Sequence, residues 1–183
     1  MTVTSVDAAY NVDLTINGEG GSDTVNLNAD ITFANGESLL VTAETLNAGA
    51  GADLTTSGAG LITLTADDVA LDATSTLVAT GTVSIQPQTA SRAIDLGTNT
   101  AGSLGLTDAE LDRITAGTLQ IGTANSGPLT VSADITRLAA TAMVLTSHAD
   151  IVVGGGSLSN VGNSTSPEPP LIPSVTSCVS WGR

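Results

Sequence analysis

The residues best suited to chemistry are acids that recur at one place in a short repeated pattern. Asp30, Glu44, Asp67 and Asp134 each close a run of alternating aliphatic and small polar residues, and His148 takes that place in a fifth copy. If the copies stack in register, these side chains form a column with a spacing of about 5 Å. Carboxylates that close repel one another unless water or a cation separates them. We expect a solvated corner, with a weak cation site and a catalytic carboxylate set as alternatives.

A glycine-rich stretch near the N-terminus adds weak candidates for calcium binding. Residues 18–25 (Gly-Glu-Gly-Gly-Ser-Asp-Thr-Val) resemble the nonapeptide of repeats-in-toxin β-rolls, although Glu19 stands where that family has its second glycine. A fainter echo, residues 49–53, ends in Asp53. In those rolls calcium lies between consecutive stacked turns, so an isolated copy lacks half of its ligands. We expect a glycine-rich turn here, and calcium at Asp23 or Asp53 is the only cofactor kept as an alternative.

No residue is predicted to be catalytic, and the main rival is a carbohydrate-active β-helix enzyme. Such an enzyme would need two converging carboxylates, a cation to assist them and aromatic rings to hold the sugar. Asp67 and Asp68 are adjacent acids, but neighbours on a strand point to opposite faces. The chain has no lysine, four scattered arginines and only 2% aromatic residues. We therefore expect Asp67 and Asp68 to form a corner, and we expect the protein not to be an enzyme.

The charge balance limits the possible partners. Eighteen acids against four arginines leave a net charge of −14. Such a surface repels nucleic-acid phosphates and anionic membranes, so neither is expected as a partner. No apolar run approaches the roughly 20 residues of a membrane span. The single cysteine, Cys178, cannot form a disulfide within the chain.

Short strands must position these side chains. Residues 129–135 alternate aliphatic with small polar residues, which is the period-two pattern of a half-buried strand. The same formula begins at residues 25, 39, 62, 83, 119 and 143, and no single period fits these gaps. Short strands joined by corners of variable length favour an all-β fold, a parallel β-helix with an aliphatic core. At about 20 residues per turn, the first 160 residues would make about seven or eight turns.

One segment is helical rather than extended. Thr107 and Glu110 have the spacing of a capping box, in which each side chain bonds to the backbone of the other. Gly117 can adopt the left-handed conformation that ends a helix. The sequence predicts a short inserted helix near residues 107–116, which covers a side or an edge of the coil.

The helix and the strand after it resemble a segment of very large bacterial surface proteins. Residues 103–122 (Ser-Leu-Gly-Leu-Thr-Asp-Ala-Glu-Leu-Asp-Arg-Ile-Thr-Ala-Gly-Thr-Leu-Gln-Ile-Gly) and 127–135 (Gly-Pro-Leu-Thr-Val-Ser-Ala-Asp-Ile) are similar to part of the filamentous-haemagglutinin-like and β-strand-repeat adhesins. The strand formula from about residue 12 to residue 158 resembles the repeat regions of the same proteins. The resemblance implies a right-handed parallel β-helix, export from the cell, and a stalk or adhesive role. Because the sequence shows neither a signal peptide nor a secretion-carrier region, we expect a piece of a longer product.

Two regions are expected, a β-helix segment over residues 1–160 and an irregular, Pro- and Ser-rich disordered tail over residues 161–183. The expected function is a structural or adhesive stalk segment, extracellular or on a bacterial cell surface. A calcium-binding β-roll segment and a β-helix enzyme fragment are the alternatives. The expected partners are neighbouring coils of the parent protein and host or matrix glycans or proteins. Neither terminus shows an amphipathic cap, so both end coils should expose unpaired backbone.

Overall fold

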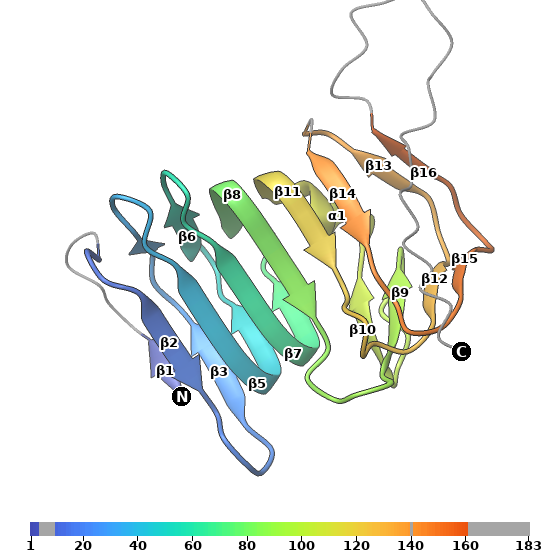
Figure 1. Ribbon diagram of the computed structural model, residues 1–183, viewed down its shortest axis with the longest axis horizontal. Coiled ribbons are helices and arrows are strands. Elements are labelled where there is room, and N and C mark those ends of the chain that lie inside the picture. Colours follow the sequence, from blue (N-terminus) through green and yellow to red (C-terminus); the bar gives the residue numbers. More distant parts are fainter. Residues whose placement is uncertain (4–9, 140, 161–183) are drawn as a thin grey trace, which may run out of the picture.

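The chain forms a parallel β-solenoid of about six turns with one short helix, which confirms the predicted fold class. The computed structural model describes residues 1–3, 10–139 and 141–160. Strands that are distant in sequence lie side by side in one row from the N-terminal to the C-terminal end (Figure 1). Among the described residues, no helix has the length and apolar character needed to cross a membrane. The tail predicted over residues 161–183 lies outside the described residues.

Each turn offers three strand positions, which make three faces that we name A, B and C. Face A holds β2 (Leu14–Asn17), β14 (Ala142–Leu145) and parts of β5 (Leu39–Ala48), β7 (Ile62–Leu71), β8 (Thr76–Gln86) and β11 (Ile114–Ile121). Face B holds β1 (Thr2–Val3), β3 (Thr24–Leu27), β9 (Ala93–Leu96), β10 (Ser103–Leu106), β12 (Leu129–Val131), β15 (Ile151–Val153) and the ends of β5 and β7. Face C holds β4 (Ile31–Thr32), β6 (Asp53–Thr56), β13 (Ile135–Arg137), β16 (Leu158–Asn160) and the starts of β8 and β11.

The turns differ in length, as expected, but most of them fall within a narrow range of 21 to 25 residues that the sequence pattern did not reveal. On face A, Leu39 pairs with Ile62 and Ile62 with Val83, so that a turn takes 21 to 23 residues. Val83 then pairs with Leu119, 36 residues on, because the fourth turn carries an insertion. The sequence pattern hid this period because the copies beginning at residues 25 and 129 lie on face B while the others lie on face A. Longer turns and the insertion also explain why there are about six turns rather than seven or eight.

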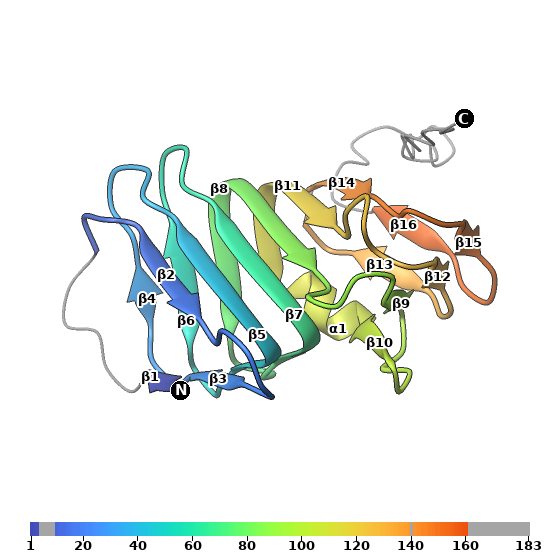
Figure 2. The ribbon, with the colours of Figure 1, turned by 60° about the horizontal axis from the view of Figure 1, so that its bottom comes forward.

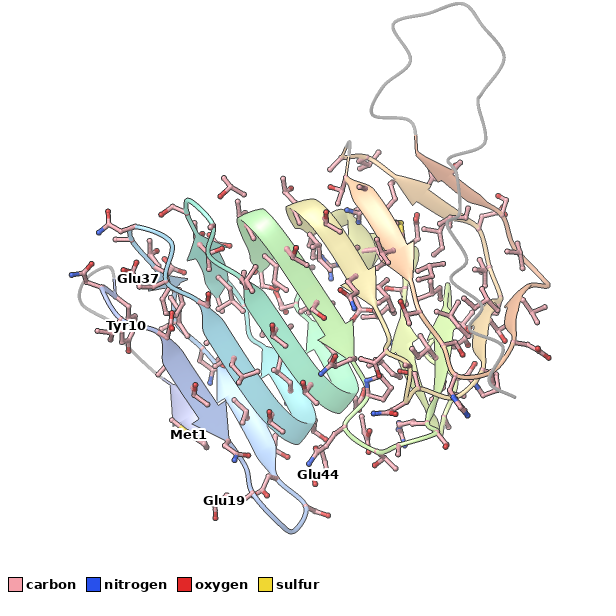
Figure 3. The ribbon with its side chains drawn as sticks, viewed as in Figure 1. Met1, Tyr10, Glu19, Glu37 and Glu44 are labelled. Atoms are coloured by element: carbon pink, nitrogen blue, oxygen red, sulfur yellow. The ribbon has the colours of Figure 1, made fainter. Side chains whose placement is uncertain are left out.

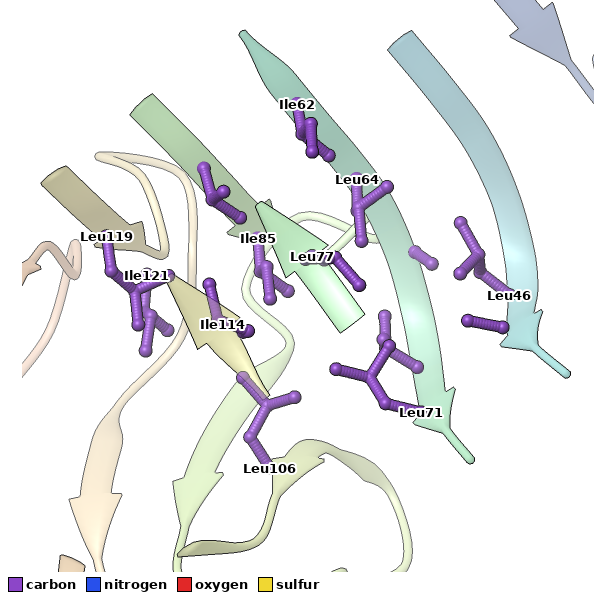
Figure 4. Packing of buried hydrophobic residues seen from close by; sticks show 14 of the residues in the cluster. Leu46, Ile62, Leu64, Leu71, Leu77, Ile85, Leu106, Ile114, Leu119 and Ile121 are labelled. Carbon is purple, nitrogen blue, oxygen red and sulfur yellow. The ribbon is translucent and has the colours of Figure 1, made fainter. Parts of the chain in front are cut away.

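Stacked aliphatic side chains fill the interior. Inward residues of successive turns lie one above another, as Leu64 lies beside Ile85 and Ile85 beside Ile121 (Figure 4). All three side chains are fully buried. The alternation of aliphatic and polar residues therefore marks inside and outside, as the sequence predicted. Truncation of such a side chain to alanine typically costs about 2–5 kcal/mol.

The inserted part of the fourth turn comprises β10 and α1 (Asp108–Asp112). β10 pairs in parallel with β9 and packs against β7, while the ladder on face A continues unbroken past the insertion. The capping box of Thr107 and Glu110 is present as predicted. The helix is shorter than the predicted range 107–116, because the chain returns to strand at Ile114.

Gly117 does not end the helix, contrary to the prediction. It lies inside β11, where the pairing with β8 is irregular between Ala116 and Thr118. A Cβ atom on Gly117 would lie 2.5 Å from the backbone oxygen of Thr80. Glycine is needed here because the neighbouring strand comes too close for any side chain.

At the N-terminal end, β1 and β2 each pair with a strand on one side only among the described residues, as predicted for an end coil without a cap, although short segments partly cover the first turn. There, β1 pairs with β3, and the backbone of Tyr10 bonds to Thr32 and Ala34 on face C. The ring of Tyr10 stacks on Phe33 with 5.4 Å between centroids. At the other end, the inward side chain of Val153 in the last turn is 57% exposed.

The close approach at Gly117 yields a matched pair of substitutions. We expect Gly117→Ala to lower the free energy of unfolding by about 1–3 kcal/mol, because the strands must shift to admit the methyl group. Gly20→Ala is the control, since a Cβ there would meet nothing within 4 Å and its stability should change by less than about 0.5 kcal/mol. Urea titration followed by circular dichroism measures both. Equal effects of the two substitutions would contradict the packing argument.

Candidate functional site

The recurring acids lie at two corners of the solenoid rather than in one column. Glu44, Asp67 and His148 lie where the chain passes from face A to face B, and Asp30 and Asp134 lie where it passes from B to C. Figure 3 shows Glu44 at the edge where β5 turns between faces, away from the edge that carries Glu37. His148 is exposed, as expected for a surface residue. These residues therefore form two groups at two corners, and not the single column that stacking in register would have produced.

The corner acids bond to backbone N–H groups of the adjacent turn. The β-ladder breaks at a corner, so N–H groups there need another acceptor. We name each such contact a corner clamp. Five carboxylates among the described residues form one, with N–H to oxygen distances of 2.7–3.1 Å: Asp13 with Ser38, Asp30 with Asp53, Glu44 with Asp23, Asp67 with Thr89, and Asp134 with Ser157.

Hydroxyl groups make the same kind of contact at other corners. Oγ of Ser38 accepts the N–H of Leu61 at 3.0 Å, and Oγ1 of Thr74 accepts the N–H of Gly51 at 2.9 Å. The partners of these clamps are again about one turn apart in sequence. A charged acceptor makes the stronger bond, which is one reason for acids at so many corners.

Helix α1 lies between β7 and β10 in the ribbon (Figure 2). Its side chains join the turns on either side of it. Oδ1 of Asp108 accepts the N–H of Thr136 at 2.7 Å, and Oδ1 of Asp112 accepts the N–H of Leu138 at 3.0 Å. Residues four apart on a helix are separated by about 6 Å along its axis, close to the roughly 6.6 Å between alternate residues of a strand. The helix thus imitates the acceptors of a strand edge for β13.

The other side of α1 holds the end of β7. Oε1 of Glu110 accepts the N–H of Leu71 at 3.2 Å, and Nη1 of Arg113 donates to the carbonyl oxygen of Leu71 at 2.5 Å. Both backbone groups of that residue are therefore satisfied by one helix. Side chains of the insertion therefore supply the hydrogen bonds that a neighbouring strand would otherwise give to the end of β7 and to β13.

Arg137 is a charged group enclosed in the interior. Its side chain is 0% exposed, and Nη2 donates to the carbonyl oxygen of Ile114 at 2.6 Å. Nε and Nη1 have no hydrogen-bond partner among the described residues. Burial lowers the pKa of Arg137 below its ordinary value, while the nearby carboxylates of Asp112 and Asp108 oppose that change. Asp108 and Asp112 therefore have two effects: they stabilise the charge of Arg137 and they accept N–H groups of Thr136 and Leu138.

Asp95 accepts hydrogen bonds from three hydroxyl groups. Burial raises the pKa of this carboxyl, but bonds from Ser132, Thr100 and Thr98 outweigh burial and leave the pKa below the ordinary value of 3.8. Thr98 and Thr100 belong to the turn between β9 and β10, and Ser132 follows β12. The carboxylate thereby ties the insertion to the next turn.

The two calcium candidates are not brought together. Asp23 precedes β3 at the corner between faces A and B, and Asp53 begins β6 at the corner between B and C. Asp53 accepts the hydroxyl of Thr76 at 2.6 Å, whereas Oδ2 of Asp23 is buried with no partner in the described part of the chain. Within that part, no three His, Cys, Asp or Glu side chains are grouped to hold a metal ion.

Asp67 and Asp68 form a corner and do not converge. Asp67 is buried and takes the clamp to Thr89, a hydroxyl bond from the same residue, and a contact of 3.7 Å from Nε of Arg92. Asp68 is exposed on the outer side of β7. Nothing in this arrangement aims two carboxylates at one point, which a glycosidase needs.

Sequence reasoning missed the clamps, Asp95 and the buried Arg137. A signal for the clamps was present, because Asp30 and Asp53, or Asp134 and Ser157, are 23 residues apart, which is one turn. It becomes visible only when the strands are sorted by face. Arg137 offered no signal, since its inward position depends on the register of β13.

The adjacent acids Asp67 and Asp68 provide a test of the clamps. We expect Asp67→Ala to lower the free energy of unfolding by about 1–3 kcal/mol, because it leaves buried donors without an acceptor. Asp68→Ala should change it by less than about 0.5 kcal/mol. Chemical denaturation at neutral pH measures both. A larger effect at Asp68 would refute the assignment.

The hydroxyl bonds of Asp95 imply an acid-sensitive contribution to stability. A pKa lowered in the folded state contributes stability that is present above the ordinary value and is lost as pH falls through the folded value. Asp95→Asn should therefore be less stable than the natural chain at pH 7, and the gap should shrink as pH falls below about 4. Thermal melts across this range measure the gap. A gap independent of pH would show that charge is not involved.

Comparisons with known proteins do not assign this chain to a family of β-solenoid proteins. No protein-family model matches the chain, and searches of curated proteins and of solved structures likewise return no match. The β-solenoid fold thus rests on the structure of the chain itself.

Proposed function

We propose that this chain is a structural stalk segment of a secreted or cell-surface bacterial adhesin, without catalytic activity. The observation that carries the proposal is the use of the corner acids. Carboxylates that could have served chemistry instead accept backbone N–H groups and hold one turn to the next. A continuous ladder on face A and one unbroken aliphatic core suit a stiff rod that holds other regions away from a surface.

The adhesin-like sequence coincides with the inserted part of the fourth turn. Residues 103–122 span β10, α1 and β11, and residues 127–135 span β12 and the corner after it. The acids of α1 within this stretch are those that reach both neighbouring turns. The part of the sequence that resembles the adhesins is therefore the part that joins the fourth turn to its neighbours, as a stalk requires.

The outer surface of face A suits weak adhesion. Thr63, Ser84 and Gln120 lie in one outward column, since their positions pair from turn to turn. Hydroxyl and amide groups repeated about every 4.8 Å could bind host or matrix glycans or proteins through many weak contacts. The other partners in this proposal are neighbouring coils of the parent protein, and its place is outside the cell.

A calcium-binding segment is the second candidate, and one observation favours it. Oδ2 of Asp23 is buried without a partner, in the loop that resembles a calcium-binding repeat. Glu44 lies beside it and accepts the N–H of Asp23 at 2.7 Å. Two carboxylates fall short of the six to eight oxygen ligands that calcium takes, so backbone oxygens and water would have to supply the others.

Pulling the 183-residue chain from both ends tests the stalk. We expect it to unravel one turn at a time, in steps of about 80 Å for turns of 21 to 25 residues. The 36-residue fourth turn should give one longer step, of about 125 Å. Smooth extension at low force would sink the proposal.

The same recordings in calcium and in a chelator separate the two candidates. A stalk gives the same forces in both, whereas a calcium-binding segment resists more in calcium and loses the difference on Asp23→Asn. Asp68→Asn is the control for removal of one negative charge.

The absence of catalytic activity in this proposal is tested separately. Incubation of the protein with acidic polysaccharides should release no new reducing ends.

A further inference from the structure

The chain contains two Asn-Gly pairs, Asn17-Gly18 and Asn35-Gly36, and the solenoid holds them in different ways. In such a pair the backbone nitrogen of the glycine can attack Cγ of the asparagine side chain, because glycine has no side chain that would keep the two atoms apart. The attack requires a glycine nitrogen that is not engaged elsewhere. It also requires an asparagine side chain that is free to turn towards that nitrogen.

The first pair is fixed at both reacting groups. Asn17 ends β2, and the N–H of Gly18 donates to the carbonyl oxygen of Thr42 on the next turn at 2.8 Å. Oδ1 of Asn17 accepts the N–H of Glu19 at 3.1 Å. The nitrogen that would attack and the side chain that would be attacked are therefore both held. A reaction at this pair has to wait until the ladder opens locally.

The second pair forms a tight turn at the corner between faces C and A. The φ angles of Asn35 and Gly36 are 57° and 100°, and the N–H of Glu37 donates to the carbonyl oxygen of Ala34 at 3.2 Å. These are the features of a type I′ turn, which favours Asn-Gly at its centre. In the described part of the chain, the N–H of Gly36 has no hydrogen-bond partner. The nitrogen that would attack is therefore available.

The side chain of Asn35 is exposed and weakly held. Among the described residues, its one hydrogen bond runs from Nδ2 to Oδ1 of Asn11, over 3.1 Å at the surface. Water competes with a bond between two exposed side chains, so that its net contribution is small. The amide of Asn35 can therefore turn towards the nitrogen of Gly36, whereas the amide of Asn17 cannot.

We propose that Asn35 is a site of spontaneous deamidation, from which the fold protects Asn17. The nitrogen of Gly36 forms a bond to Cγ of Asn35, the bond from Cγ to Nδ2 breaks, and ammonia leaves with the proton of the glycine nitrogen. Water then opens the cyclic imide at either of its carbonyl carbons. One product is aspartate, and the other is isoaspartate, in which the main chain runs through the former side chain. The reaction belongs to this turn and is independent of the stalk function.

The products alter the corner in charge and in chain length. Deamidation adds a negative charge where the carboxylates of Asp13 and Glu37 already lie (Figure 3 labels Glu37). Isoaspartate also lengthens the main chain in a turn that packs closely on the next one. A Cβ atom on Gly58 would lie 3.4 Å from Cα of Gly36, so there is little room between the two turns. Both changes are expected to loosen the first turn of the solenoid as the protein ages.

Peptide mapping by mass spectrometry tests this site on the full 183-residue chain. The folded protein is incubated in mildly alkaline buffer, and conversion of amide to acid is followed at both asparagines. We expect Asn35 to be converted about tenfold faster than Asn17 or more, because Asn17 reacts only when the ladder opens. The same incubation in concentrated urea removes the protection, and the two rates should then agree within about threefold.

Asn35→Gln is the matched variant, since it keeps the amide but must close a larger ring. Conversion at this position should fall about tenfold or more, with no change at Asn17. Equal rates at the two pairs in the folded chain would overturn the proposal. So would a folded chain in which Asn35 stays intact while urea allows its conversion. Aspartate without isoaspartate at this position would also overturn it, because direct hydrolysis of the amide gives no isoaspartate.

Discussion

The strands of each turn must lie in register with the strands of the next turn, because the backbone groups of one turn are the hydrogen-bond partners of the other. The parallel ladder sets a turn of 21 to 25 residues and stacks like positions one above another. A narrow interior then follows, lined by aliphatic residues and almost without rings. Among the described residues, Phe33 at the N-terminal end is the one aromatic side chain that is fully enclosed.

The corners are where this arrangement is hardest to satisfy, and there the acids are used. A chain with a net charge of −14 would repel itself if its carboxylates served only solubility. Many of them instead accept N–H groups that the ladder leaves free at the corners, so the negative charge is compensated by backbone dipoles. The same acids thereby join one turn to the next. This structural use of the charge is the observation that supports the stalk proposed above.

The insertion and the N-terminal end show how the solenoid tolerates a break in its ladder. At the fourth turn, α1 supplies acceptors to Thr136 and Leu138 and holds both backbone groups of Leu71, so turns on either side remain joined. At the N-terminal end, residues 1–3 and Tyr10 cover the first turn. In both places, side chains or short segments satisfy backbone groups that the regular ladder leaves unpaired.

The amino-acid sequence by itself determined the parallel β-helix, the inward and outward alternation and the capping box at Thr107, because each depends on residues close together in the chain. It could not reveal the common period, since two faces carry the same short pattern and one turn holds an insertion. Only the tertiary structure decided which corner each acid occupies, why Gly117 lies in a strand and why Arg137 is enclosed. These features depend on contacts between residues one turn or more apart, and such contacts exist only once the register between turns is set.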